Sequence, residues 1–579
     1  MLRIVFVFAL VFIFFRTLLT STVGFQLKWD LFLWDHFYEH EWNEVLDQIS
    51  NKITQKVPIE IQIGQILHSG ISGTKVNPEL AKQIQHYCLG GFILFKSNIE
   101  SKEQLKILID DLQKLSLEHC KIPLFFGIDQ EGGRVERITG FVKDFPSAMA
   151  VGQTGKSEYA WLMGFLTGYE MFSLGIPLVY APVADINNNP LNPVINTRSF
   201  GSDEETVSKM VVSYIEGINY THAIGFLKHF PGHGDTTIDS HFDLPIIDKS
   251  EEELWKLELK PFLKGIRAKA KGVMIAHILY PKLDDVPSSL SKKIIQELLK
   301  NKMNFQGIVI TDALEMKAVS RTYLVEDLSY RSFIAGVDIL LLTAQNQNVD
   351  KIYKFFLEKL KNKELPKERI QESFRMQMAM KLSSFLFPIE LLMNEYQIPN
   401  DLLEKYKQLF EFKNQISQKI YERIQKRFPN IEYQISYEGI RSLYKNFPKL
   451  DLDSSRVFVF YQKQTNYEEW KMIQNQTPEV IFWLAPFNEF EMWKYIFEED
   501  DYVIVEIKNS NEWNEISQQD LIYRKLIGYF DGVPFQPFFI KENQYIIASF
   551  SPTITSNKAM IRKIMNDSIP KARLKLAQE

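Results

Sequence analysis

The fold is decided around the sequence Lys228-His229-Phe230-Pro231-Gly232-His233-Gly234-Asp235-Thr236-Thr237-Ile238-Asp239-Ser240-His241-Phe242-Asp243-Leu244-Pro245. It holds three of the ten histidines of the chain, together with three aspartates. Glycines and a proline lie between them, which predicts a loop rather than a helix or a regular strand. The apolar run just before it, 223–227, predicts a short buried strand. A strand that ends in a loop of titratable side chains is typical of a parallel α/β barrel, whose functional groups lie at the carboxyl ends of its strands.

Outward from this stretch, short apolar runs alternate with longer segments of helical periodicity. The runs are 63–67, 91–95, 124–128, 177–181, 223–227, 272–276, 307–310 and 337–342. Such alternation predicts successive βα units and a parallel sheet. Eight units over this length predict a (β/α)8 TIM-type barrel. A doubly wound parallel sheet is the alternative.

The chain has 579 residues, which is too long for one ordinary domain. We assign the barrel to residues 59–387, with a helical linker at 26–58 before it. A second helical linker, 388–450, leads to a smaller α/β sandwich domain at 451–579. Strands are predicted there at 457–461, 480–484, 502–506 and 545–549, and this part of the sequence contains no catalytic motif that we recognise.

The amino terminus is strongly apolar, because Arg3 precedes the uninterrupted apolar run 4–15. This pattern is typical of the apolar region of a signal peptide. The run is shorter than the roughly 20 residues that span a bilayer. A longer span through about residue 25 is the alternative, if Arg16 reaches the interface. We expect residues 1–25 to be a signal peptide or a membrane anchor rather than a buried helix of a cytoplasmic protein. The protein is then periplasmic, bound in the cell envelope, extracellular or anchored to the inner membrane.

Charge and cysteine content narrow the class of protein. Lys and Arg number 67 against 72 Asp and Glu, for a net charge of -5. A nearly balanced chain has no electrostatic footprint for nucleic acid. The two cysteines, Cys88 and Cys120, are too few for a disulfide scaffold. One disulfide is arithmetically possible, but we expect two buried thiols.

Polar residues follow consecutive strands of the predicted barrel at Asp129, Asp185, the stretch 228–245, His277 and Asp312. Any one of them could simply cap the helix that follows. Because the carboxyl ends of parallel strands meet at one rim, several together predict a functional site there.

Two candidates for catalysis stand out at this rim. In an extended segment, Asp239 and His241 point the same way. The carboxylate can therefore orient one ring nitrogen and leave the other free for proton transfer, although a histidine that only packs in the loop is the alternative. Asp312 is either a carboxylate nucleophile at a strand end or the N-cap of the next helix, with Glu315 as its capping partner.

Candidate binding groups surround the same rim. Lys228, His229 and Arg198 supply donors, Asp129 supplies an acceptor, and Arg137 follows it in the chain. Carboxylates mixed with Arg and Lys predict a pocket suited to sugar hydroxyls. A metal site within 228–245 is the less favoured alternative, because the spacing matches no zinc motif and the glycines give no fixed ligand face. We predict no metal and no cofactor.

Six segments, in order along about residues 60–345, carry a resemblance to a known family. They are 128–135 (Ile-Asp-Gln-Glu-Gly-Gly-Arg-Val), 180–187, 198–201, 228–245, 273–278 and 311–316 (Thr-Asp-Ala-Leu-Glu-Met). The chain resembles the bacterial β-N-acetylglucosaminidase branch of glycoside hydrolase family 3, in its two-domain exported type. It departs from the pattern at Asn196, where the family usually has glycine.

The resemblance implies a (β/α)8 barrel that hydrolyses terminal β-linked N-acetylglucosamine with retention. Carried over by motif, Asp312 corresponds to the nucleophile and His241 to the acid/base that Asp239 orients. The positions that correspond to substrate-binding residues are Asp129, Arg137, Arg198, Lys228 and His229.

We therefore expect a retaining exo-β-N-acetylglucosaminidase whose partner is an N-acetylglucosamine-containing glycan, with peptidoglycan fragments as its source. A β-glucosidase or an N-acetylglucosaminide phosphorylase of the same family is one alternative. A non-catalytic sugar-binding protein of the envelope is the other.

Overall fold

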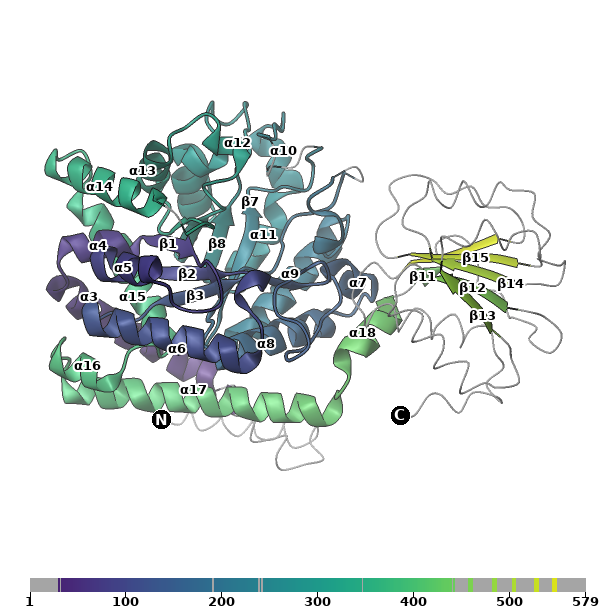
Figure 1. Cartoon of the computed structure of the whole chain (residues 1–579), viewed down its shortest axis with the longest axis horizontal. Coiled ribbons are helices and arrows are strands. Elements are labelled where there is room, and N and C mark those ends of the chain that lie inside the picture. Colours follow the sequence, from purple (N-terminus) through teal and green to yellow (C-terminus); the bar gives the residue numbers. More distant parts are fainter. Residues whose placement is uncertain are drawn as a thin grey trace, which may run out of the picture.

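The structure is a computed structural model that describes most of the chain up to residue 442 and five later strands (Figure 1). The described residues are 30–31, 33–189, 192–237, 240, 243–345, 347–439, 441–442, 457–461, 482–486, 502–506, 525–530 and 544–548. The predicted signal peptide or anchor at 1–25 lies outside them. No helix within the described residues is both long enough and apolar enough to cross a membrane.

Eight parallel strands form the central barrel, as the sequence predicts. In spatial order they are β10 (Leu340–Leu341), β1 (Leu67–Gly70), β2 (Gly91–Leu94), β3 (Phe125–Ile128), β6 (Leu178–Val179), β7 (Ile224–Phe230), β8 (Gly272–Ile275) and β9 (Ile308–Thr311). Along the chain β1 is the first of these strands and β10 the last, and the two pair with Leu67 opposite Leu340. A parallel bridge from Ile310 of β9 to Ile339, just before β10, closes the circle. This circular order confirms the barrel and excludes the doubly wound sheet, which has open edges.

The barrel interior is filled by side chains that alternate along the strands. Ile224 and Phe226 of β7 and Ile308 and Ile310 of β9 belong to one buried apolar cluster. Residues two apart on a strand point to the same face, so each strand sends one set inward and the other toward the surrounding helices. The interior is therefore a packed core.

The outer layer consists of amphipathic helices that cover the strands (Figure 1). The main ones are α5 (Pro78–Tyr87), α6 (Lys102–His119), α8 (Ser157–Ser173), α9 (Glu204–Asn219), α11 (Leu259–Arg267), the π-helical Lys293–Lys302, α13 (Val325–Ala335), α14 (Asn348–Lys361) and α15 (Lys367–Ser383). Shorter helices are α4 (Ile59–Gln65), α7 (Ala148–Gln153), α10 (Glu251–Lys256) and α12 (Lys317–Ser320). Several begin at the polar caps expected for them: the side chains of Asn77, Ser101 and Asp203 accept hydrogen bonds from the first turns of α5, α6 and α9.

The prediction for the first strand is wrong by several residues. Residues 63–65 lie in α4, and β1 begins only at Leu67. Ile59, Ile61 and Ile63 alternate as in a strand, but Ile63 and Ile66 are also spaced as on a helix face, and both are fully buried. Periodicity alone cannot separate these two conformations over so short a run. The backbone also packs closely here: a Cβ on Gly64 would lie 1.6 Å from the carbonyl oxygen of Tyr87, so the position requires glycine.

The beginning of the stretch 228–245 is also not the loop that its composition predicts. Lys228, His229 and Phe230 continue β7, and Phe230 pairs with Ile275 of β8 after a shift in register beyond Leu227. The register shift is typical of a β-bulge, a feature that often re-aims side chains beside functional sites. The loop therefore begins only after Phe230.

The segments predicted as helical linkers form helices that pack on the barrel. These are α3 (Glu39–Lys56), α16 (Ile389–Asn394), α17 (Asn400–Arg427) and α18 (Ile431–Gly439). The Trp42 ring of α3 stacks on Tyr406 of α17 at 5.4 Å, and the Tyr406 hydroxyl donates to the carbonyl of Leu382. These helices therefore share the core of the barrel domain.

A second sheet follows α18. Its order is β11 (Arg441–Ser442), β16 (Gln544–Ala548), β15 (Lys525–Phe530), β14 (Tyr502–Glu506), β12 (Val457–Tyr461) and β13 (Phe482–Pro486), parallel except for β11. The four predicted strands are present, two of them shifted by one or two residues. β15 was not predicted, because Gly528 interrupts its apolar pattern. The segments between these strands, and the predicted boundary at 451, lie outside the described residues.

The prediction that Cys88 and Cys120 are free thiols is wrong. Both are buried as expected, but they form a disulfide with a Cα–Cα distance of 5.6 Å. Cys88 follows the last residue of α5 and Cys120 follows the last residue of α6. Neighbouring helices of a βα barrel run parallel, so their ends meet at one side of the molecule. That proximity is a tertiary property that the sequence spacing does not reveal.

We predict that Cys88→Ser/Cys120→Ser lowers the free energy of unfolding. The cross-link spans 32 residues, for which the chain-entropy relation gives about 3–4 kcal/mol. Denaturant unfolding of the oxidised protein and of the double variant measures the difference. Alkylation in denaturant provides the control: two alkyl groups should be added only after reduction, and modification without reductant would contradict the disulfide.

Candidate active site

A cavity of about 180 Å³ opens at the carboxyl ends of the barrel strands. Six of the eight predicted site residues line it: Asp129, Arg137, Arg198, Lys228, His229 and Asp312. The other two, Asp239 and His241, lie outside the described residues. Ser240, which stands between them in the chain, lines the same cavity.

The centre of the site is the buried ammonium group of Lys228 at the end of β7. Its Nζ lies 2.8 Å from Asp129 Oδ1 and 2.5 Å from Glu131 Oε1. Arg137 Nη2 approaches the other oxygen of Asp129 at 3.2 Å. Burial alone would raise the pKa of Asp129, but the charges of Lys228 and Arg137 lower it by a larger amount. The carboxylate therefore remains ionised.

Glu131 is a site residue that the sequence analysis did not select. Arg198 holds it through two parallel hydrogen bonds, Nε to Oε2 and Nη2 to Oε1, both 2.8 Å long. Burial raises the pKa of Glu131, but Arg198 and Lys228 hold it well below its usual range. The sequence did contain a signal for Glu131, which lies two residues after Asp129. In an extended segment such as β4 (Gln130–Gly132), side chains two residues apart point the same way.

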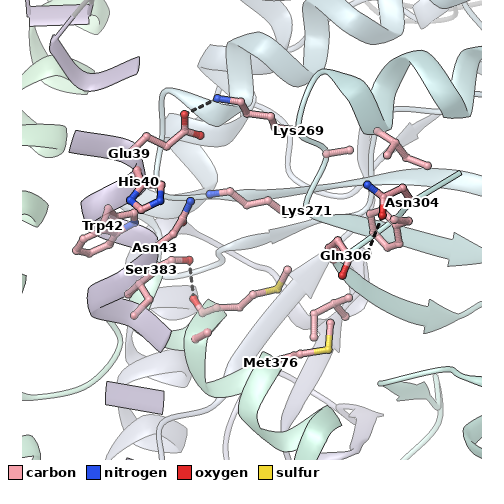
Figure 2. A pocket seen from close by; sticks show the side chains of 18 of the residues that line it. Glu39, His40, Trp42, Asn43, Lys269, Lys271, Asn304, Gln306, Met376 and Ser383 are labelled. Atoms are coloured by element: carbon pink, nitrogen blue, oxygen red, sulfur yellow. Dashed lines mark hydrogen bonds and ion pairs between the residues drawn. The ribbon is translucent and has the colours of Figure 1, made fainter. Parts of the chain in front are cut away.

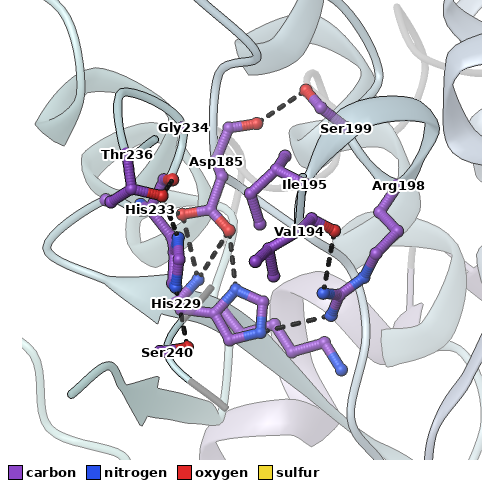
Figure 3. Close-up of polar contacts among 12 residues, drawn as sticks. Asp185, Val194, Ile195, Arg198, Ser199, His229, His233, Gly234, Thr236 and Ser240 are labelled. Atoms are coloured by element: carbon purple, nitrogen blue, oxygen red, sulfur yellow. Dashed lines mark hydrogen bonds and ion pairs between the residues drawn. The ribbon is translucent and has the colours of Figure 1, made fainter. Parts of the chain in front are cut away.

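His229 is oriented by a second residue that was not selected, Asp185 (Figure 3). Asp185 Oδ2 accepts from His229 Nδ1 at 2.7 Å, and the carboxylate also accepts from the backbone N–H groups of His229 and His233. Because Nδ1 carries the hydrogen, His229 Nε2 is left to accept from Arg198 Nη2 at 3.2 Å. Burial raises the pKa of Asp185, but the two histidines lower it more.

His233 anchors the loop that leads to the predicted proton-transfer pair (Figure 3). Its Nδ1 is 2.9 Å from Thr236 Oγ1 and its Nε2 is 3.0 Å from Ser240 Oγ. Burial lowers the pKa of His233 to about 4, so the ring is neutral and offers one donor and one acceptor. Asn192 Nδ2 donates to the carbonyls of His233 and Gly234, which holds the turn from the other side.

Asp312 stands beyond the last residue of β9. Its Oδ1 accepts from the backbone N–H of Ala313 at 2.8 Å, and no Lys or Arg among the described residues forms an ion pair with it. Burial raises the pKa of Asp312, but His229, His277 and the Ala313 N–H lower it below its usual value. The carboxylate is therefore ionised and faces the cavity without a lysine or arginine partner in the described part of the chain.

The structure also rules out the helix cap as the role of Asp312. The next helix, α12, begins at Lys317 with Met316 as its N-cap residue. Glu315, the suggested capping partner, accepts instead from the backbone N–H and the hydroxyl of Thr343. His277 lies beside this segment and contacts the carbonyl of Ala313 through Nε2 at 3.1 Å.

The remaining wall of the cavity is apolar and aromatic. Phe95 and Met274 line it together with Tyr180, whose buried hydroxyl has no hydrogen-bond partner among the described residues. No group of three or more His, Cys, Asp or Glu among those residues is arranged to hold a metal ion. The arrangement presents one reactive carboxylate, several fixed donors and acceptors, and an apolar floor, which suits a small polyhydroxylated ring.

Comparison with known proteins identifies the class. The family described as Glycosyl hydrolase family 3 N terminal domain matches residues 49–378. β-Hexosaminidase A of Pseudoalteromonas piscicida is 37% identical over 300 residues, which are 49% of this chain and 50% of that protein. A β-hexosaminidase of Haemophilus influenzae is 33% identical over 284 residues, 48% of this chain and 79% of its own. The chain thus spans half the length of the first of these relatives.

One solved structure shares the fold over most of the chain. It is a glycoside hydrolase family 3 β-N-acetylglucosaminidase from Paenibacillus sp. str. FPU-7, with a TM-score of 0.73 and 24% identity. The match covers 89% of this chain and 97% of that one. The barrel and its site therefore define a glycoside hydrolase. The chain belongs to glycoside hydrolase family 3, which confirms the resemblance seen in its motifs.

We predict that Asp185→Asn lowers the free energy of unfolding at neutral pH by about 1.5–3 kcal/mol, because hydrogen bonds to a charged acceptor are lost. The pKa of folded Asp185 lies below the usual 3.8. Its ionised form therefore stabilises the fold above about pH 4, and this contribution is lost as the pH falls through the folded pKa.

Denaturant unfolding at pH 7 and at several values below 4 measures this effect. The difference between the two proteins should shrink as the pH falls. Asp248→Asn removes a carboxylate from an exposed ion pair, and should change stability by less than about 0.5 kcal/mol. A pH-independent loss in Asp185→Asn would contradict the assignment.

Proposed function

We propose that the protein is a retaining exo-β-N-acetylglucosaminidase that removes terminal β-linked N-acetylglucosamine from a glycan. The observation that carries the proposal is Asp312, an ionised buried carboxylate with no cationic side-chain partner among the described residues, at the wall of a cavity rich in fixed donors. A carboxylate kept free of ion pairs is available for attack on carbon, whereas Asp129 and Glu131 are occupied by Lys228 and the arginines. Relatives named β-hexosaminidase support the choice of substrate class.

The first chemical step uses Asp312 and His241. An oxygen of Asp312 bonds to the anomeric carbon of the bound sugar while the bond from that carbon to the leaving oxygen breaks. The leaving oxygen takes a proton from His241, which Asp239 orients. The roles of His241 and Asp239 rest on the sequence resemblance, since both residues lie outside the described part of the chain.

The second step restores the enzyme. His241 takes a proton from a water molecule, the water oxygen bonds to the anomeric carbon, and the bond to Asp312 breaks. Because both displacements occur at the same carbon, the product keeps the β configuration. The depressed pKa of Asp312 keeps it ionised across the neutral range, so it is ready to attack without first losing a proton.

Specificity is assigned to the charged cluster that surrounds the nucleophile. Asp129 and Arg137 supply an acceptor and a donor on one side, and Lys228 and Arg198 supply donors on the other, where His229 accepts from Arg198 and so orients it. A cavity of about 180 Å³ is small compared with the ≈ 300–1,000 Å³ of sites for drug-sized ligands. Its size favours a single sugar ring, and therefore removal of a terminal residue.

We predict that Asp312→Asn lowers kcat/KM by more than about a thousandfold, because the amide cannot form the covalent intermediate. Turnover of a chromogenic N-acetylglucosaminide measures the loss. Asp327→Asn removes a surface carboxylate paired with Arg331 and is the matched control, expected to change kcat/KM less than twofold. Undiminished turnover by Asp312→Asn would overturn the proposal.

Two further measurements separate the alternatives. Nuclear magnetic resonance of the first-formed product should show the β anomer, whereas an α anomer would contradict retention. A β-glucoside cleaved faster than the N-acetylglucosaminide would favour a β-glucosidase, and faster turnover with added phosphate would favour a phosphorylase. Binding of N-acetylglucosamine without turnover would favour a sugar-binding protein.

We also propose that the enzyme is exported and acts on peptidoglycan fragments. The apolar run 4–15 after Arg3 supports export. The disulfide Cys88–Cys120 is consistent with an oxidising compartment, where such bonds form and persist.

Expression in a Gram-negative host followed by fractionation and intact-mass measurement tests the location. We expect either a periplasmic chain that lacks about the first 25 residues or a full-length chain in the membrane fraction. A full-length chain in the cytoplasmic fraction would contradict export. Release of N-acetylglucosamine from purified peptidoglycan fragments tests the substrate source.

A further inference from the structure

An ion-pair bridge of three residues, Asp235, Lys249 and Glu258, lies at the base of the loop that follows β7. Lys249 Nζ is 2.7 Å from Asp235 Oδ2 and 2.5 Å from Glu258 Oε1. Glu258 is the N-cap residue of α11 and is almost completely buried, whereas the other two are partly exposed. Burial alone would lower the pKa of Lys249, but the two carboxylates raise it by a larger amount. One charged ammonium group therefore holds two carboxylates together.

The outgoing limb of this loop, which contains Asp235, packs closely on its surroundings. A Cβ on Gly234 would lie 1.6 Å from the carbonyl oxygen of Ile186, so the backbone rests directly on the segment that follows β6. Glu258 contacts the same limb, because a Cβ on Gly232 would lie 3.0 Å from the Cβ of Glu258. The carboxylate of Glu258 is thus placed beside the outgoing limb by backbone packing.

The returning limb, which contains Lys249, is held by a different strand end. Leu279, in the segment after β8, accepts from the Ile247 N–H at 3.0 Å and donates its own N–H to the carbonyl of Pro245 at 2.9 Å. Ser250 then caps the first turn of α10 with its side chain. Both sets of contacts are hydrogen bonds between neutral groups, and the charged bridge ties the two limbs directly to each other.

The segment between the two limbs contains the predicted proton-transfer pair, Asp239 and His241. Ser240, which stands between them in the chain, lines the cavity, where its hydroxyl lies 3.0 Å from His233 Nε2. This segment therefore reaches the site. Because fixing the ends of a loop restricts the conformations of the residues between them, the bridge limits where the pair can lie.

Loss of the Lys249 charge would separate the two limbs. Asp235 and Glu258 contact the same nitrogen, so without it two carboxylates would face each other and repel. Glu258 is buried and would be left with an uncompensated charge. Asn188 Nδ2, at 3.3 Å from Glu258 Oε1, is a neutral donor and does not balance that charge. Asp235 is the more exposed carboxylate and would turn toward water.

From the bridge and its place at the base of the loop, we propose that Lys249 is a positioning residue for proton transfer. By holding Asp235 against Glu258, it sets the position from which His241 gives a proton to the leaving oxygen and takes one from water. The inference rests on the proposed function, because it assigns to Lys249 an effect on that reaction. Lys249 itself does not line the cavity.

Two substrates that differ in their need for an acid test the proposal. Dinitrophenolate leaves without a proton, whereas the sugar hydroxyl released from diacetylchitobiose needs one. We expect Lys249→Met to lower kcat/KM for diacetylchitobiose about 10- to 100-fold, because the acid is misplaced. For dinitrophenyl N-acetylglucosaminide the loss should be less than about threefold. Lys249→Arg keeps the charge and should restore turnover of the disaccharide to within about threefold of the wild type.

The double variant Lys249→Met/Glu258→Gln guards against a loss of folding. It removes the buried carboxylate charge together with its partner, so no uncompensated buried charge remains. We expect the same dependence on the leaving group as in Lys249→Met, in protein whose thermal unfolding shows a folded state.

Azide gives an independent measurement of the second step. It bonds to the anomeric carbon while the bond to Asp312 breaks, and unlike water it needs no general base. With the dinitrophenyl substrate, azide should raise kcat of Lys249→Met and should leave that of the wild type unchanged.

Lys269→Met is the matched control. Lys269 forms an exposed ion pair with Glu39 at the amino end of the barrel, away from Asp312 (Figure 2). Its loss should change kcat/KM less than about twofold for either substrate.

The outcomes separate the inference from the proposed function. Equal losses on the two substrates, or unchanged turnover of diacetylchitobiose by Lys249→Met, would overturn the inference and leave the proposed function intact. Wild-type protein that cleaves neither substrate would contradict the proposed function, and the inference with it.

Discussion

The active end of the barrel depends on one buried ammonium group, that of Lys228. It joins Asp129 and Glu131, which follow β3, to the end of β7, and Glu131 in turn holds Arg198. Burying a lone charge costs several kcal/mol, so such a group is stable only when its partners are buried with it. The two carboxylates are each paired with two cations, Asp129 with Lys228 and Arg137, and Glu131 with Lys228 and Arg198.

Because these charged groups pair with one another, Asp312 can remain without a lysine or arginine partner among the described residues. Three other described carboxylates near the cavity are engaged, Asp129 and Glu131 by cationic side chains and Asp185 by two histidines. Asp312 accepts from a backbone N–H and feels the charges of two imidazoles and of Lys228, but no lysine or arginine among the described residues forms an ion pair with it. Asp312 is therefore ionised and available for attack on a substrate carbon.

Much of this arrangement is local in the sequence, and local features were predicted well. Seven of the eight barrel strands lie close to the predicted runs, because each run is short, apolar and bounded by polar residues. Six of the eight site residues line one cavity, since strand ends of a parallel barrel share a rim. Two of the errors concern conformations that sequence leaves ambiguous: α4, whose isoleucines fit both a helix and a strand, and β15, interrupted by Gly528. Asp239 and His241 remain predictions.

By itself the sequence determined the order of βα units, the set of polar residues at the strand ends and the family motifs, since these depend on periodicity and on neighbours in the chain. Only the tertiary structure decided which of those residues pair. Glu131 with Arg198, Asp185 with His229 and Cys88 with Cys120 join segments that are distant along the chain. Their partnership follows from the closure of the barrel, which brings separate strand ends and helix ends together.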